Sequence, residues 1–113
     1  RTNAGVDNIA RFGKMRTFAV PGERVIVTLS AGNLSVTQGA LSILEQRQRL
    51  DASQPSLWNV PSMFDVAGLI GGAMRDVQRR DGDYMREHKI DASASMIFGG
   101  QIRGEGPRLF LVY

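Results

Sequence analysis

The start of the sequence shows a strand-like pattern of hydrophobic and polar positions. Residues 14–20 alternate polar and apolar side chains with some slippage. Residues 24–29 are β-branched and almost entirely apolar, which is typical of a strand buried on both faces. Pro21 and Gly22 separate the two segments and favour a tight turn, so the pattern predicts a β-hairpin. A shorter hairpin is expected within residues 1–12.

A first amphipathic helix is predicted after this hairpin. The sequence Ala31-Gly32-Asn33 ends the second strand. Ser35 and Gln38 then have the spacing of a capping box, in which each side chain satisfies a free amide at a helix start. We therefore expect a helix that continues to about Leu50. Its apolar face consists of Leu34, Ala40, Leu41, Ile43 and Leu44.

The segment between the first helix and the next is predicted to be a loop. Residues 51–61 contain two prolines and show no hydrophobic periodicity. Leu57 and Trp58 are large apolar side chains within it. We expect both to pack down onto a helix.

A second, longer helix is predicted from Ser62 to about Glu87. Apolar residues recur in it at spacings of three and four, which indicates one buried face. These residues are Met63, Val66, Ala67, Ile70, Met74 and Val77. Gly68, Gly71 and Gly72 interrupt the helix, and each costs about 1 kcal/mol relative to alanine. We expect close packing against a neighbouring helix or sheet to be the reason for these glycines.

The end of the chain returns to a strand-like pattern. Residues 95–102 are predicted to form a strand, residues 104–107 a turn, and residues 108–113 the returning strand. The order of strands, two helices and strands is typical of an α+β domain. In such a domain the two helices cover one face of a mainly antiparallel sheet.

Glycines near the end of the chain raise a nucleotide-binding alternative. Gly99-Gly100 and Gly104-Glu105-Gly106 lack the Lys-Ser/Thr pair that holds phosphate and metal in a P-loop. Pro107, directly after them, favours a hairpin turn. The pattern therefore favours a turn over a phosphate site, and no cofactor is predicted.

Composition and charge exclude several further classes of function. The net charge is only +3, and the arginines of the second helix alternate with aspartates. That pattern is more typical of a solvated or subunit-facing surface than of a nucleic-acid site. The sequence has no cysteine, and its single His88 has no metal-ligand partner at helical spacing, so no metal site is predicted. No apolar run approaches the roughly 20 residues that cross a bilayer, so no membrane partner is expected.

Three short sequences, in their order along the chain, resemble one family of N-terminal-nucleophile hydrolases. They are Arg1-Thr2-Asn3-Ala4-Gly5-Val6-Asp7, then Phe12-Gly13-Lys14-Met15, then Leu29-Ser30-Ala31-Gly32-Asn33-Leu34-Ser35. Two helices and a strand with Phe98-Gly99-Gly100-Gln101 follow them. The family is that of the bacterial proteasome-type proteases called Anbu, the ancestral β-subunit family. The resemblance covers essentially the whole chain. It implies a partial αββα sandwich, in which residues 1–113 form an incomplete proteasome β-type domain.

The resemblance implies a threonine endopeptidase. In this family a threonine at the mature N-terminus is the nucleophile, and its own α-amine serves as the general base. An aspartate and a lysine complete the charge arrangement, and a backbone amide at a glycine stabilises the oxyanion. The resemblance also implies peptide or unfolded protein substrates, a ring-like or stacked homo-oligomer, and a cytoplasmic location.

By this resemblance, Lys14 matches the active-site lysine and Gly32 matches the oxyanion glycine. An ammonium beside the threonine amine lowers the pKa of that amine by like-charge repulsion, so the amine is neutral near pH 7. A glycine amide approaches a tetrahedral oxygen without a side chain in the way. Taken alone, Lys14 is more typical of a surface lysine at a strand end than of a catalytic residue. Gly32, taken alone, merely allows the strand-to-helix turn.

The resemblance also marks residues that contact the substrate. Thr2, Asn3 and Ala4 match the segment along which a peptide substrate lies as an added strand. Ser30 and Leu34 match positions that shape the pocket for a substrate side chain. A core position is the alternative for Leu34.

The chain ends, together with the resemblance, indicate an internal piece of a longer subunit. The chain begins with Arg1, without an initiator Met, and it finishes in an apolar, strand-like run. The resemblance places the nucleophilic threonine and its partner aspartate before Arg1, and further catalytic groups after Tyr113. We therefore predict that the 113-residue chain alone has no peptidase activity. The alternative function is a non-catalytic assembly module of the same fold, with its interface on the helix at residues 62–80.

Overall fold

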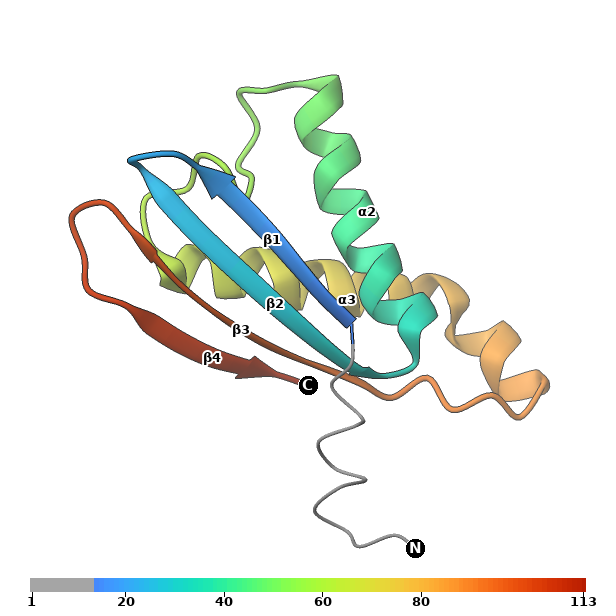
Figure 1. Cartoon of the computed structure of the whole chain (residues 1–113). Coiled ribbons are helices and arrows are strands. Elements are labelled where there is room, and N and C mark those ends of the chain that lie inside the picture. The colour runs from blue at the N-terminus through green and yellow to red at the C-terminus, as the bar shows by residue number, and fades with distance from the viewer. Residues whose placement is uncertain (1–13) are drawn as a thin grey trace, which may run out of the picture.

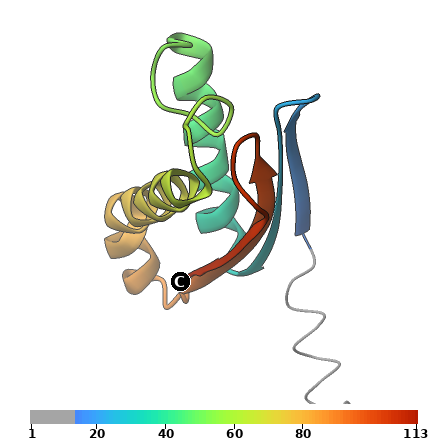
Figure 2. The same ribbon diagram turned by 90° about the vertical axis from the view of Figure 1, so that its left-hand side faces the viewer.

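The computed structural model describes residues 14–113, which form an antiparallel sheet covered by two helices. In chain order the elements are β1 (Lys14–Val20), β2 (Arg24–Gly32), α2 (Leu34–Leu50), α3 (Met63–Glu87), β3 (Ala94–Ile102) and β4 (Arg108–Val112). The strands lie in the order β1-β2-β3-β4, and each pairs antiparallel with the next. Figures 1 and 2 show α2 and α3 on the same face of this sheet. The predicted α+β class is confirmed.

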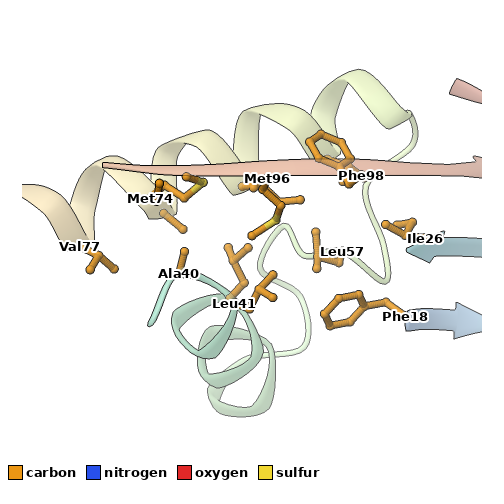
Figure 3. Packing of buried hydrophobic residues seen from close by; sticks show 14 of the residues in the cluster. Phe18, Ile26, Ala40, Leu41, Leu57, Met74, Val77, Met96 and Phe98 are labelled. Atoms are coloured by element: carbon orange, nitrogen blue, oxygen red, sulfur yellow. The ribbon is translucent and has the colours of Figure 1, made fainter. Parts of the chain in front are cut away.

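The hydrophobic core lies between the helices and one face of the sheet. Even-numbered strand residues point to the helices, because side chains alternate along a strand. The buried residues labelled in Figure 3 are Phe18, Ile26, Ala40, Leu41, Leu57, Met74, Val77, Met96 and Phe98. Leu57 therefore reaches the core from its loop. Its neighbour Trp58 packs edge-on against Phe18 of β1, with 5.5 Å between the ring centroids.

The opposite face of the sheet is open and apolar. Met15, Leu29, Ile97 and Leu111 stand beside one another across β1, β2, β3 and β4. Met15 is 64% exposed and Leu111 is 54% exposed. A hollow of about 310 Å³ opens on this face, and it is lined by Val27, Leu29, Ile97, Gly99, Gly100 and Leu109. The face thus has the composition of a sheet that packs against a second layer, as in an αββα sandwich.

The two helices begin in different ways. At α3 the prediction is confirmed, because Ser62 is the N-cap and its Oγ accepts the amide of Asp65 at 3.1 Å. At α2 the predicted capping box at Ser35 is wrong. The N-cap is Asn33, whose Oδ1 accepts the amide of Ser35 at 2.8 Å. Asn33 has the extended backbone that an N-cap requires, whereas Ser35 already lies in the first helical turn.

Close packing does not account for the glycines of α3. A Cβ added to Gly68 or Gly72 would meet no atom within 4 Å, so the packing predicted at these positions is wrong. At Gly71 a Cβ would meet the end of the Arg75 side chain at 3.4 Å and Val112 of β4 at 3.7 Å, which is near ordinary contact. Gly68 and Gly72 therefore face outward from α3 with room for a larger side chain.

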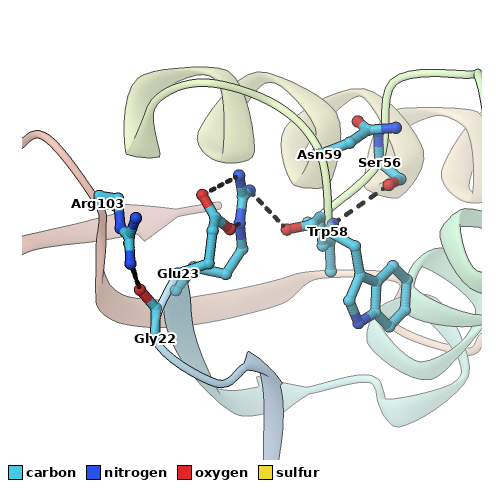
Figure 4. A network of polar contacts seen from close by, with 8 residues as sticks. Gly22, Glu23, Ser56, Trp58, Asn59 and Arg103 are labelled. Carbon is cyan, nitrogen blue, oxygen red and sulfur yellow. Dashed lines mark hydrogen bonds and ion pairs between the residues drawn. The ribbon is translucent and has the colours of Figure 1, made fainter.

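A polar network joins both hairpin turns to the loop between the helices (Figure 4). The buried side chain of Arg24 pairs with Glu23 and donates a hydrogen bond to the carbonyl of Leu57 at 3.0 Å. Arg103, after β3, donates to the carbonyl of Gly22 at 2.7 Å. The hydrogen bond from Arg24 holds the pKa of Glu23 below its ordinary value. This network fixes the end of the sheet that lies away from Gly32.

Candidate functional site

Lys14 begins β1 at the end of the sheet where β2 finishes (Figure 1). The strand register places Lys14 directly opposite Ser30. Gly32 lies two residues further along β2, so it is a diagonal neighbour of Lys14, and such neighbours are about 7–8 Å apart. The side chain of Lys14 is exposed, and the alternation of the strand directs it to the helix-covered face. Both residues that were predicted to be catalytic thus lie at one end and on one face of the sheet.

Gly32 has a backbone that requires glycine. Its φ is +83°, in the left-handed region that other residues rarely adopt. A Cβ at this position would lie 2.6 Å from the carbonyl oxygen of Ser93 and 3.0 Å from the α-carbon of Ala94. Gly32 therefore does allow the turn from strand to helix. This turn is compatible with a second role for its amide.

The hydrogen-bond pattern of β2 sets the direction of the Gly32 amide. The amide of Asn33 donates to the carbonyl of Ser93 at 2.9 Å, and the carbonyl of Glu23 accepts the amide of Arg103 at 2.8 Å. Odd-numbered residues at both ends of β2 thus bond toward β3. Successive residues of a strand direct their amides to opposite sides, so the amide of Gly32 points away from β3, toward the side of β1 and Lys14.

Asn33 fixes the junction between β2 and α2. Its Nδ2 donates to the carbonyl of Asp91 at 2.9 Å, while its Oδ1 caps the helix. The carboxylate of Asp91 in turn accepts the amide of Ser93 at 2.9 Å, and the hydrogen bonds from Ser93 lower the pKa of Asp91. Sequence reasoning missed this role of Asn33. The available signal was an asparagine, a preferred N-cap residue, between a strand end and a helix start.

The predicted pocket residues flank Gly32 in the structure. Ser30 is buried and lies between Lys14 on β1 and Met96 on β3. Leu34 is the first residue of α2 and is 44% exposed, so the core alternative for Leu34 is wrong. The contribution of both residues to a substrate pocket stays a prediction. The three predicted substrate-binding residues Thr2, Asn3 and Ala4 lie outside the described residues.

A cleft of about 350 Å³ lies beside the same junction. It is lined by Asn33, Ser35, Asp81, Tyr84, Met85 and Ile90. These residues bring together the start of α2, the end of α3 and the loop before β3. The cleft therefore adjoins the residue that follows Gly32.

Neither a candidate metal cluster nor a candidate membrane-spanning helix is present in residues 14–113. That part of the chain contains no cluster of three or more His, Cys, Asp or Glu side chains that could hold a metal ion. Neither of its helices is both long enough and apolar enough to cross a membrane.

The fold and the site define a class of protein. Two helices cover one face of a four-stranded antiparallel sheet. Lys14 begins β1, and it lies close to Gly32, which ends the neighbouring strand β2. This arrangement is that of the proteasome-like N-terminal-nucleophile hydrolase fold, and similar solved structures have the same fold. No protein-family model matches the sequence, and no curated protein is similar to it at a significant level.

Solved structures resemble the chain over its whole length. Anbu (ancestral beta-subunit) from Yersinia bercovieri has 48% sequence identity and a TM-score of 0.77, and the match covers 100% of this chain and 45% of that chain. The helical assembly of the Anbu complex from Pseudomonas aeruginosa has 43% identity and a TM-score of 0.78, covering 100% of this chain and 46% of that chain. Anbu from Hyphomicrobium sp. strain MC1 has 43% identity and a TM-score of 0.70, covering 100% and 45%. The chain therefore belongs to the Anbu family, and it spans less than half the length of these relatives.

Proposed function

We propose that this chain is the part of a proteasome-like threonine peptidase subunit that supplies the active-site lysine and the oxyanion amide. Residues 1–113 are then an incomplete proteasome β-type domain. The intact subunit hydrolyses peptide bonds of peptides or unfolded proteins in the cytoplasm, and it works as a ring-like or stacked homo-oligomer. The nucleophile is an N-terminal threonine upstream of Arg1.

The observation that carries the proposal is the placement of Lys14 beside Gly32. The register puts Lys14 opposite Ser30 and diagonally next to Gly32, on one face of the sheet. The Gly32 amide is directed to the side of β1, where Lys14 begins the strand. A threonine from outside the described residues would reach both groups if its strand lay beside this end of the sheet.

The chemistry assigned to Lys14 is electrostatic. Its ammonium lowers the pKa of the α-amine of the nucleophilic threonine, because two like charges at close range disfavour the protonated amine. The neutral amine then accepts the proton of the threonine hydroxyl as that oxygen attacks the substrate carbonyl.

The chemistry assigned to Gly32 follows from the same attack. The tetrahedral intermediate carries its negative charge on the former carbonyl oxygen, and a preorganised amide stabilises that charge. The start of α2 directly after Asn33 adds the positive end of a helix dipole nearby.

The proposal is tested in the intact subunit by Lys14→Met, with Lys89→Met as the matched control. Lys89 is exposed and is the second lysine of the sequence. Lys14→Met is expected to lower kcat on a fluorogenic peptide library by about 10²–10⁴-fold at pH 7. The acidic limb of its pH–rate profile moves to higher pH, because the threonine amine regains its ordinary pKa. An unchanged kcat and profile in Lys14→Met sinks the assignment.

The second candidate function is a non-catalytic assembly module. The outward-facing Gly68 and Gly72 of α3 favour it, because no atom of residues 14–113 occupies the space beside them. A relative is also known as a helical assembly. The sequence of the intact subunit separates the two functions: a mature N-terminal threonine with an aspartate between it and Arg1 supports the peptidase, and the lack of both supports the assembly module.

A further inference from the structure

Asn33 makes more contacts than a helix cap needs. Its Oδ1 alone caps α2, as the single Oγ of Ser62 caps α3. The remaining donors of Asn33 bond elsewhere: Nδ2 to the carbonyl of Asp91 and the backbone amide to the carbonyl of Ser93, both at 2.9 Å. Serine caps a helix as well as asparagine does but has no second donor of this kind. Capping alone therefore does not account for asparagine here.

The loop that receives these bonds is itself ordered by a local contact. The carboxylate of Asp91 accepts the amide of Ser93, which bends the loop so that two carbonyls face Asn33. One of these, the carbonyl oxygen of Ser93, is also the atom that a Cβ added at Gly32 would meet at 2.6 Å. The same loop thus contacts the glycine and the residue that follows it.

A glycine amide needs outside support to serve as an oxyanion donor. Glycine is the most flexible residue, and it has no side chain through which its orientation is held. A catalytic donor has to be placed within about 0.5 Å and 10–20° of its productive geometry. Before Gly32 the pairing of β2 with β3 gives that support, and directly after it Asn33 is held by the cap of α2 and by its bonds to the loop.

We propose that Asn33 is a positioning residue, which orients the Gly32 amide by tying the end of β2 to the loop at residues 91–93. The inference rests on the proposed function, because it concerns the oxyanion donor of that reaction. It makes the loop between α3 and β3 part of the structure that positions the oxyanion donor. Asn33 acts only through the backbone of its neighbour.

The test compares Asn33→Ser with Ser62→Ala in the intact subunit. Asn33→Ser keeps an oxygen that caps α2 and loses the bond to Asp91, whereas Ser62→Ala removes a helix cap at a distant site. Asn33→Ser is expected to lower kcat by about 100-fold with little change in KM. The same substitution is also expected to weaken the binding of a peptide boronate by a similar factor, because the tetrahedral anion of the boronate occupies the oxyanion position. Ser62→Ala leaves both quantities unchanged. Asn33→Asp, which keeps the shape but replaces the donor with an acceptor, serves where the serine variant does not fold.

A crystal structure of the Asn33 variant separates this inference from the proposed function. A Gly32 amide that superposes on that of the unmodified subunit overturns the inference, whatever the activity. Equal losses of kcat in the Asn33 and Ser62 variants overturn it as well. If the Gly32 amide is displaced in the variant, the positioning role of Asn33 is upheld. If the unmodified subunit also neither cleaves peptides nor binds the boronate, the peptidase function is refuted.

Discussion

Replacing Gly100 by alanine is expected to disrupt the pairing of β2 with β3. An ideal Cβ at this position overlaps the carbonyl oxygen of Val25 and lies 2.9 Å from the α-carbon of Ile26. Both atoms belong to the backbone of the neighbouring strand, so no side-chain rotation relieves the contact. The strands have to separate by roughly 1 Å, which lengthens hydrogen bonds of ordinary length to nearly 4 Å.

The size of the effect follows from the bonds that flank the substitution. The residue pairs Val25–Gln101 and Val27–Gly99 lie on either side of Gly100 and are hydrogen-bonded pairs by the alternation of β2. Each bond contributes about 0.5–1.5 kcal/mol net, so the loss of both pairs costs about 2–6 kcal/mol. This is a large share of the roughly 5–15 kcal/mol that stabilises a typical domain.

The measurement is urea denaturation of the intact subunit, followed by circular dichroism. Gly99→Ala is the matched control, because its Cβ would meet the end of the exposed Leu109 side chain at 3.1 Å and the backbone carbonyl oxygen of Arg108 at 3.3 Å. The side chain can turn away and the backbone has to shift only slightly, so the control is expected to lose only about 1 kcal/mol. The reasoning is refuted if Gly100→Ala unfolds at the same urea concentration as the unmodified chain, or if Gly99→Ala is the more damaging change.

Three further predictions use the intact subunit and the same denaturation experiment. Gly68→Ala and Gly72→Ala should each raise the free energy of unfolding by about 1 kcal/mol, because nothing crowds them in α3; a midpoint that does not rise contradicts this. Leu57→Ala should lower the free energy of unfolding by about 2–5 kcal/mol, because Leu57 is 0% exposed; a negligible loss would place the loop outside the core. Glu23 has a lowered pKa, so its stabilisation is complete above about pH 4.3 and is lost as the pH falls through the folded-state pKa. Glu23→Gln should make the free energy of unfolding depend less on pH in that acidic range. Equal pH dependence of the variant and the unmodified protein would count against the ion pair with Arg24.

The sheet and the helices were predictable because their periodicity is carried by neighbouring residues. Pro21 and Gly22 between two strand-like segments indicated the hairpin, and the spacing of Met63 to Val77 indicated the buried face of α3. The placement of Lys14 and Gly32 at one end of the sheet follows from that hairpin. Their catalytic roles do not follow from it, because those roles came from the family resemblance.

Features that depend on distant parts of the chain were not predictable in the same way. The bond from Asn33 to Asp91 joins residues 58 positions apart, and only the assembled fold brings them together. Ser35 and Asn33 are both of residue types that begin helices. Because β2 ends at Gly32, the helix begins at Leu34 and Asn33 is its N-cap. For Gly68 and Gly72, the helix pattern shows that glycine is costly, but the space beside a residue is a property of its surroundings.

The open apolar face of the sheet has a consequence for the self-association of the newly synthesised chain. The row from Met15 to Leu111 crosses all four strands, and a nascent chain that exposes such a surface attracts other copies of itself. Synthesis and covering of this row therefore have to follow each other closely. A molecule stalled between the two steps is a natural client for chaperones, and it tends to precipitate when they are scarce.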